Sequence, residues 1–357
     1  MIVRPLLVLA FAGFVAAPPP AASQTTSHTL RGDTIAIYNL VGELRVQSGE
    51  GSDVVVEVRR GGNDAAQLEI RTGPLRGRET LRVIYPGDRI VLPDWGRGWN
   101  TTLRVRDDGT FGDGGDHRGG WLREGREVRI TGRGRDGLEA YADVIVRVPA
   151  GKRVALHLGV GKASVRNVDG EISVEVASAD VTADHTRGVL SIETGSGNVD
   201  VSDGAGAINL ETGSGDISSA RIRATRLVLE TGSGNVTITD ADAPQLHVET
   251  GSGDITASGA KGEDVSFETG SGNIDVALVA TFTSLSIETG SGDVTLRVPP
   301  TLGAQVDLET GSGDIDLGGL TVQVRRIEED HITGTIGDGR GRLSIETGSG
   351  NVRLVKL

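Results

Sequence analysis

The sequence predicts an all-β protein, a parallel β-solenoid or single-stranded β-helix, with about eleven short rungs and an N-terminal β region. Two observations support this prediction. The motif Glu-Thr-Gly-Ser-Gly, followed by Asp or Asn and then Ile or Val, recurs about every nineteen residues, which is typical of stacked repeats. The residues that flank the motif alternate between apolar and polar side chains, which is the period of half-buried strands.

The copies of the motif are located by their glutamate. Two weaker copies, at residues 157–161 and 175–181, come before the series, and Thr333-Gly334-Thr335 lies where a degenerate copy belongs. With these, the repeats account for about eleven rungs. The full copies begin at Glu193, Glu211, Glu230, Glu249, Glu268, Glu288, Glu309 and Glu346.

Each copy reads as strand, Gly-Ser-Gly turn and strand. In one copy Leu227 and Leu229 precede the turn, and Val236 and Ile238 follow it with Thr237 in the alternating polar position. One such pair of strands cannot bury its own apolar face, so we expect copies to stack about 4.8 Å apart. The glycines permit positive φ at the corner and let adjacent backbones approach with no Cβ between them. The crossover rule favours a right-handed coil.

The chain divides by composition into four segments. Residues 1–23 have the features of a cleaved secretory signal, 24–92 form an N-terminal β region, 93–140 are a Gly- and Trp-rich insertion, and 141–357 are the β-solenoid repeat domain. Long segments without regular structure are usually functional or disordered. The insertion is therefore a candidate for sugar or partner binding, or a flap that packs its own rings, through Trp95, Trp99, Trp121, Arg97, Arg118 and Arg123.

The first segment places one cation, Arg4, before an apolar run from Leu6 to Ala17 and a small-residue tract that ends at Ser23. This is the order of a secretory signal. No later stretch approaches the roughly 18 uninterrupted apolar residues of a membrane helix. We therefore expect an exported protein, in the periplasm, at the cell surface or outside the cell, that does not span the membrane.

The cysteine content indicates how the fold is stabilised, and the charge indicates which partners the chain can bind. The chain has no cysteine, so its stability must come from burial and backbone hydrogen bonds, although exported proteins can keep disulfides. The formal net charge is -13, and residues 157–357 hold 30 acidic against 14 basic side chains. An acidic repeat region argues against nucleic acid as a partner, because phosphates need a basic face. Cations or cationic partners fit this charge better.

Three stretches together resemble a known bacterial family. They are the Gly-Ser-Gly-Asp-Ile steps, the opening run Ile35-Ala36-Ile37-Tyr38-Asn39-Leu40-Val41-Gly42-Glu43-Leu44-Arg45-Val46, and Val144-Ile145-Val146-Arg147-Val148-Pro149-Ala150-Gly151. The chain is similar, over roughly residues 34–92 and 141–357, to the β-strand-repeat domain of unknown function labelled putative adhesin. The resemblance implies a β-solenoid outside the cytoplasm and carries over no catalytic residue.

Two columns of acidic side chains should run along the stack. The second column alternates as Asn198, Asp216, Asn235, Asp254, Asn273 and Asp293, which spreads like charges and allows hydrogen bonds along the ladder. The Glu column has no such alternation. Solvent screening, hydrogen bonds from neighbouring Thr and Ser hydroxyls, or bound Ca²⁺ could each offset its repulsion. Calcium is also conceivable at Asp107-Asp108-Gly109 and at residues 112–116, although a glycine-rich turn is the simpler interpretation.

Catalytic patterns are weak, and we expect no catalytic, cofactor-binding or metal residues. No His-x-x-x-His pair occurs, and Thr-Gly-Ser-Gly is not the nucleophile elbow Gly-x-Ser-x-Gly. Gly159-Val160-Gly161-Lys162 resembles a phosphate loop but falls in the register of a rung. The six histidines are scattered, at His28, His117, His157, His185, His247 and His331.

The sequence therefore predicts a non-catalytic binding or scaffolding protein of the cell envelope, with a surface glycan or an envelope protein as partner. A polysaccharide lyase or hydrolase is the alternative, because a groove lined by carboxylates and basic residues could hold a sugar chain, and an extracytoplasmic sensor is another. Arg31-Gly32-Asp33 matches a receptor-binding tripeptide too short to be specific. The basic residues that could line a groove are Arg221, Arg223, Arg226, Arg325 and Arg326.

Overall fold

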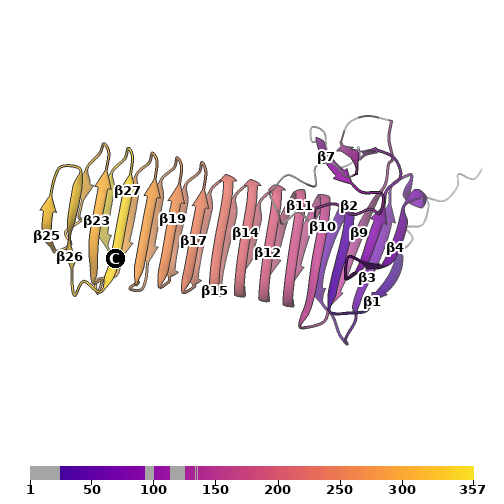
Figure 1. Ribbon diagram of the computed structural model, residues 1–357, viewed down its shortest axis with the longest axis horizontal. Helices are drawn as coiled ribbons and strands as arrows, with labels where there is room; N and C mark the ends of the chain where they lie inside the picture. Colours follow the sequence, from indigo (N-terminus) through magenta and orange to yellow (C-terminus); the bar gives the residue numbers. More distant parts are fainter. Residues whose placement is uncertain (1–24, 93–99, 113–124, 133, 135) are drawn as a thin grey trace, which may run out of the picture.

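A computed structural model of the chain describes residues 25–92, 100–112, 125–132, 134 and 136–357. The protein is all-β, and the described residues contain no α-helix and a single 3-10 turn, η1 (Ala65–Gln67). Strands form a long row, with the N-terminal region gathered at one end (Figure 1). The expected all-β class is confirmed. The proposed signal, residues 1–23, lies outside the described residues.

The N-terminal end combines parallel and antiparallel pairing. The strand β3 (Val54–Gly61) is antiparallel to β1 (Thr25–Leu30) on one side and to β9 (Tyr141–Val148) on the other. A second antiparallel pair is formed by β4 (Glu69–Leu75) and β5 (Arg78–Ile84). The long strand β2 (Thr34–Ser48) is parallel to β5, to β9 and to β10 (Lys152–Arg166). It thus lies inside the parallel stack, between β9 and β10, although residues 49–140 separate it from both in sequence.

The repeats stack in parallel with the motif in register. Glu193 lies opposite Glu175 and Glu211, and the same glutamate pairing continues through Glu230. The strands are β10 (Lys152–Arg166), β11 (Asp169–Asp184), β12 (Arg187–Ser196), β13 (Val199–Ser202), β14 (Ala205–Ser214), β15 (Ile217–Ser233), β16 (Val236–Asp242), β17 (Gln245–Thr250), β18 (Ile255–Lys261), β19 (Asp264–Thr269), β20 (Ile274–Leu278), β21 (Ser284–Thr289) and β22 (Val294–Val298).

The core is a continuous row of aliphatic side chains between the two strands of each layer. Leu227, Leu229, Val236 and Ile238 are fully buried, as their alternation predicts, and Phe267 is the one phenylalanine buried to the same degree in the described repeats. Thin layers leave room for branched aliphatic residues and little room for rings, which accounts for an aromatic content of only 3%.

Part of the insertion folds into a separate small sheet. β8 (Arg126–Thr131) pairs with β6 (Arg89–Val91) in parallel and with β7 (Asn100–Val105) in antiparallel fashion. This sheet lies over the first layers of the stack (Figure 1). The tryptophans Trp95, Trp99 and Trp121 lie outside the described residues, as do Arg97, Arg118 and Arg123.

At the C-terminal end the copies do not stack in sequence order. β27 (Gly341–Thr347) pairs in parallel with β21 on one side and with β23 (Ala304–Thr310) on the other. β28 (Val352–Lys356) likewise lies between β22 and β24 (Ile315–Asp316). The last copy of the sequence is therefore inserted between the two copies that precede it (Figure 1).

The expectation that Thr333-Gly334-Thr335 forms a degenerate copy was wrong. These residues belong to β26 (His331–Ile336), which runs antiparallel to β23 and to the outermost strand, β25 (Val322–Ile327). The segment has no Gly-Ser-Gly turn, and it covers the edge of β23 that would otherwise be open. Antiparallel strands thus cap both ends of the parallel stack, as terminal units of repeat proteins commonly do.

Spatial order restores the alternation of Asp and Asn. In sequence order Asp293 and Asp314 would be neighbours, whereas in the structure Asn351 lies between them: its backbone N–H donates to Asp293, and its Oδ1 accepts from the backbone of Asp314. Because a neutral amide separates the two carboxylates, this order avoids placing like charges in adjacent layers. Through the stack the order is Asp180, Asn198, Asp216, Asn235, Asp254, Asn273, Asp293, Asn351 and Asp314.

Asn351→Asp is expected to destabilise the C-terminal layers by about 0.5–1 kcal/mol at pH 7, because it creates three adjacent carboxylates while keeping the Oδ1 acceptor. The loss should shrink in high salt, which screens exposed charges. Denaturation at low and high salt checks this. The control, Asp293→Asn, keeps the acceptor and removes a charge, so it should not destabilise; an equal loss in both variants at every salt concentration would contradict the charge argument.

Candidate functional site

The Gly-Ser-Gly corner is built on close backbone contacts between layers. A Cβ on Gly234 would lie 1.9 Å from the carbonyl oxygen of Gly215, and one on Gly253 would lie 1.9 Å from that of Gly234. A Cβ on Gly232, the other glycine of the corner, would lie 2.6 Å from the oxygen of Gly213. The expectation that these glycines remove a steric obstacle to stacking is therefore confirmed.

The Asp/Asn column is a ladder of side chain to backbone hydrogen bonds. The backbone N–H of Asn235 donates to Oδ1 of Asp216 at 2.8 Å, and the N–H of Asp254 donates to Oδ1 of Asn235 at 2.9 Å. The predicted ladder exists, but its links need only an Oδ1 atom, which Asp and Asn both supply. A side-chain amide donates to a carboxylate at Asn351, whose Nδ2 lies 3.1 Å from Oδ1 of Asp293.

The threonine of each motif points inward, which corrects one expectation for the Glu column. Thr250 is 1% exposed, and its hydroxyl donates to the carbonyl oxygen of Gly234 in the neighbouring layer at 2.9 Å. Thr hydroxyls therefore stabilise the corner and do not bond to the glutamates. Equivalent bonds are made by Thr194, Thr212, Thr231, Thr269, Thr289, Thr310 and Thr347.

The Glu column lies on the outer surface of the stack. Glu249, Glu268 and Glu288 are exposed, which agrees with solvent screening as the way in which their repulsion is reduced. A serine hydroxyl reaches the column at Ser286, 3.2 Å from Glu288. The possibility of bound Ca²⁺ in this column stays a prediction.

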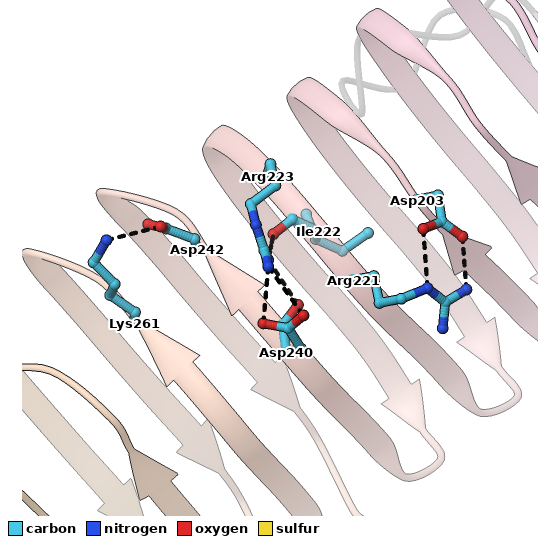
Figure 2. Close-up of polar contacts among 7 residues, drawn as sticks. All are labelled: Asp203, Arg221, Ile222, Arg223, Asp240, Asp242 and Lys261. Carbon is cyan, nitrogen blue, oxygen red and sulfur yellow. Dashed lines mark hydrogen bonds and ion pairs between the residues drawn. The ribbon is translucent and has the colours of Figure 1, made fainter.

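The opposite corner carries ion pairs between layers. Arg221 donates from Nε and Nη2 to the two carboxylate oxygens of Asp203 at 2.9 and 2.6 Å. Arg223 donates from Nη2 to both carboxylate oxygens of Asp240, at 3.1 and 3.0 Å, and Lys261 lies 2.8 Å from Asp242 (Figure 2). These contacts join successive layers. Arg221 and Arg223 are therefore part of the scaffold, which removes them from the expected groove.

The same corner places non-glycine residues at positive φ. His185, Asp203, Arg221 and Asp240 have φ of 52°, 53°, 55° and 56°, and Gly259 continues the series at 71°. Left-handed geometry is unusual for residues other than glycine. Its repetition in successive layers shows that it is the turn geometry of this corner and not a local distortion.

One group of possible metal ligands lies at this corner. Ligand atoms of Asp184, His185 and Asp203 all lie within 4.8 Å of one another. The carboxylates are already engaged, because Asp203 binds Arg221 while Asp184 accepts a bond from Ser202 at 2.7 Å and lies 3.0 Å from His185. The group is therefore accounted for by ion pairs, and calcium binding stays a prediction.

Arg221→Gln should raise the pKa of Asp203 toward the ordinary value of about 3.9, because the hydrogen bond from Arg221 holds that pKa below its usual range. A lowered carboxyl pKa stabilises the fold above the unfolded pKa, and this contribution is lost as pH falls through the folded value. NMR titration of the side-chain carboxyls measures the shift. The pKa of Asp184, lowered chiefly by Ser202 and then by His185, should stay low in the variant; an unchanged pKa for Asp203 would contradict the pairing.

The segment that follows β7 meets the stack at an aromatic contact. His157 is 5% exposed and stacks on Tyr38 at a centroid distance of 4.4 Å, and Phe111 contacts both rings edge-on. Nδ1 of His157 lies 3.1 Å from Glu175, and a Cβ on Gly112 would lie 2.1 Å from the same carboxylate. The insertion thus packs against Glu175, at one end of the Glu column. Sequence reasoning missed this contact because its partners are far apart in the chain.

Several other predicted residues have structural partners. Asp108 accepts bonds from the backbone and hydroxyl of Thr110 in a tight turn, which agrees with a glycine-rich turn at residues 107–109. Gly161 lies in β10 beside Gly42, so residues 159–162 form strand and no phosphate loop. In the turn between β1 and β2, Arg31 lies 3.7 Å from Asp53.

The other arginines expected to line a groove, Arg226 and the pair Arg325 and Arg326, lie in different parts of the structure. Arg326 is on the edge strand β25 and pairs with Glu328, which follows the strand; charged side chains at such an edge discourage pairing with another sheet. Arg226 lines an open pocket of about 360 Å³ together with His247 and Asp264. Of the five arginines expected to line a groove, Arg226 thus lines a pocket.

Comparison with known proteins identifies a family. The model of the Toastrack DUF4097 family matches residues 140–355. No curated protein matches the sequence. A solved structure described as a putative cell adhesion protein from Clostridium sporogenes is similar at 11% identity over 94% of this chain and all of that chain, but a TM-score of 0.21 gives this likeness no weight.

Proposed function

We propose, since the chain belongs to the Toastrack DUF4097 family, that it is a non-catalytic exported protein that binds or scaffolds at the cell envelope, as an adhesin does. We further propose that it is a right-handed parallel β-solenoid of about eleven rungs, made by the ten remaining copies and by β2, which stacks in register on β10. It would display its binding surface at a fixed distance from its point of attachment. This agrees with the resemblance drawn from residues 34–92 and 141–357.

The observation that supports a non-catalytic role is that the repeated polar side chains form hydrogen bonds and ion pairs between layers. The Asp/Asn column bonds to the backbone of the next layer, and the Thr column bonds to glycine carbonyls. The basic residues Arg221 and Arg223 are held in ion pairs between layers. A catalytic site is a single constellation at one place, whereas these groups recur and serve the stack.

Export is supported by the signal-like order of residues 1–23. Among the residues that the structure describes, no helix is long and apolar enough to cross a membrane. A destination in the periplasm, at the cell surface or outside the cell is consistent with the proposed role, and a glycan or an envelope protein is the proposed partner.

A binding screen of mature protein against glycans and envelope proteins tests this function. We expect binding that survives Glu249→Gln and Glu268→Gln and that is lost when residues 93–140 are deleted. Because the deletion removes β7 and β8, substitution of Trp95, Trp99 and Trp121 by Ala provides a second variant that leaves those strands intact. The release of new sugar ends from any polysaccharide would favour the enzyme alternative, and the absence of binding to every glycan and envelope protein would overturn the proposal.

A further inference from the structure

The Asp/Asn ladder stops at one end of the stack. Asp180 accepts the backbone N–H of Asn198, and the position beside Asp180 in the preceding layer is occupied by Lys162. Beyond Lys162 the same position is Glu43, in β2. A cation therefore stands where every layer from Asp180 to Asp314 has an Asp or Asn.

Two cations of this region lack a hydrogen-bonded partner in the described part of the chain, although the pKa of Glu43 is lowered chiefly by the hydrogen bond from Arg45 and in smaller part by the charge of Lys162. Lys162 and, four residues on, Arg166 are exposed side chains of β10 that make no hydrogen bond or ion pair within the described part of the chain. The nearby acid Glu43 is already engaged, because Arg45 donates to its two oxygens at 2.7 and 2.6 Å. At the opposite corner, by contrast, Arg221 and Arg223 are both paired.

These side chains line a pocket of about 660 Å³ on the outer face of β2, β10, β11 and β13. Both cationic donors and carboxylate acceptors line it. Asn198 uses its Oδ1 to accept from the backbone of Asp216, which leaves its Nδ2 hydrogens for another acceptor. The polar residues that line the pocket include Lys162, Ser164, Arg166, Thr182, Asn198 and Asp200.

The lining selects among ligand classes by its charge and polarity. Lys162 and Arg166 are balanced by the carboxylates of Asp180 and Asp200, so neither a polyanion nor a polycation is favoured overall. No aromatic side chain is among the residues that line it in the described chain, which disfavours a flat apolar ligand. Sugar hydroxyls both donate and accept hydrogen bonds, and they match a surface that offers carboxylates beside ammonium, guanidinium and amide groups.

We propose that this pocket is a saccharide-binding site for a neutral segment of a glycan. Asp200 accepts from sugar hydroxyls, while Lys162, Arg166 and Nδ2 of Asn198 donate to sugar oxygens. Such a site deepens the proposed function, on which it rests, by adding a second contact for the glycan, on the stack, to the one expected in the insertion, so that full binding needs both. The pocket's volume falls in the range of about 300–1,000 Å³ typical of small-molecule sites.

Titration calorimetry of the mature protein with neutral malto-, cello-, manno-, xylo- and chito-oligosaccharides tests the site. We expect at least one series to bind, and both Lys162→Ala and Asp200→Ala to weaken it about tenfold, the effect of one lost charge-assisted hydrogen bond. Because the lining charges balance, affinity should change less than about twofold between low and physiological salt. Asp203→Ala and Arg221→Ala, at the opposite corner, are the matched controls and should leave binding unchanged.

The opposite responses of the two variants distinguish the ligand classes. An anionic ligand would bind more tightly after Asp200→Ala, and a cationic ligand would bind more tightly after Lys162→Ala; either result overturns the proposal. Absence of binding to all five series also overturns it. Oligosaccharide binding that persists in both pocket variants but is lost in the Trp variant of the insertion would reject this site and leave the proposed adhesin-like function standing.

Discussion

Gly234→Ala is expected to disrupt the centre of the stack and to lower its stability by about 3 kcal/mol or more. The added methyl carbon would lie 1.9 Å from the carbonyl oxygen of Gly215. That oxygen belongs to the backbone of a hydrogen-bonded layer, so the strain cannot be relieved by rotating a side chain. The two layers must move apart and lose part of their parallel ladder. Chemical denaturation followed by circular dichroism measures the loss.

The matched control for this prediction is Gly259→Asn. Gly259 has a φ of 71°, and a Cβ there would have its nearest neighbours at 3.5 Å. Asp240, at the corresponding corner of the adjacent layer, already has this conformation. We expect a change within about 0.5 kcal/mol. Equal effects of the two substitutions would contradict close backbone approach as the reason for the glycines that recur at the Gly-Ser-Gly corner.

Removal of residues 341–357 is expected to release the whole C-terminal cap and not only one terminal layer. The truncation takes away Leu343, Ile345, Val352 and Leu354, which are at most 1% exposed. Burial of each such side chain contributes roughly 1.5–3 kcal/mol. It also opens a gap between β21 and β23, which have no direct pairing with each other among the described strands. Hydrogen exchange should show that residues 304–336 lose protection while residues 175–260 keep it.

A sequence-ordered stack would respond differently to the same truncation. In that arrangement residues 304–316 would remain bound to β21 and β22, and their amides would stay protected. Slow exchange in β23 after truncation would therefore contradict the inserted position of the last copy. A shortened chain that ends at residue 303 serves as the reference, because it also removes the cap and should protect residues 175–260 to the same degree.

Much of the fold follows from the length of the repeat and from the alternation of inward and outward side chains along each strand. The alternation that buries Leu227 and Leu229 also places Thr231 on the inner side, so the inward threonine could have been predicted from this alternation alone. The ion pairs of Arg221 and Arg223 could have been found by aligning the copies, since each arginine stands about one repeat from its acid. These contacts join neighbouring layers. They can therefore be predicted by comparing equivalent positions in successive copies of the repeat.

The order of the last copies is harder to predict, because chemically similar layers can stack in more than one order. The one available signal is the interruption of the Asp/Asn alternation, where Asp314 follows Asp293 in sequence and Asn351 comes later. The contact between Phe111 and His157 has no repeat to reveal it. The pocket at Lys162 could have been suspected from the same comparison, because Lys162 replaces the Asp or Asn of the other copies.

A disulfide cross-link tests most directly the central claim that the last copy is inserted between the two before it. The chain has no cysteine, so introduced pairs are free of competing thiols. Ser344 lies opposite both Ser286 and Asp307, at the distance between adjacent strands, which a disulfide can span. We predict rapid cross-linking of Ser286→Cys with Ser344→Cys and none of Ser286→Cys with Asp307→Cys. The reverse result would show that the copies stack in sequence order and would contradict this account.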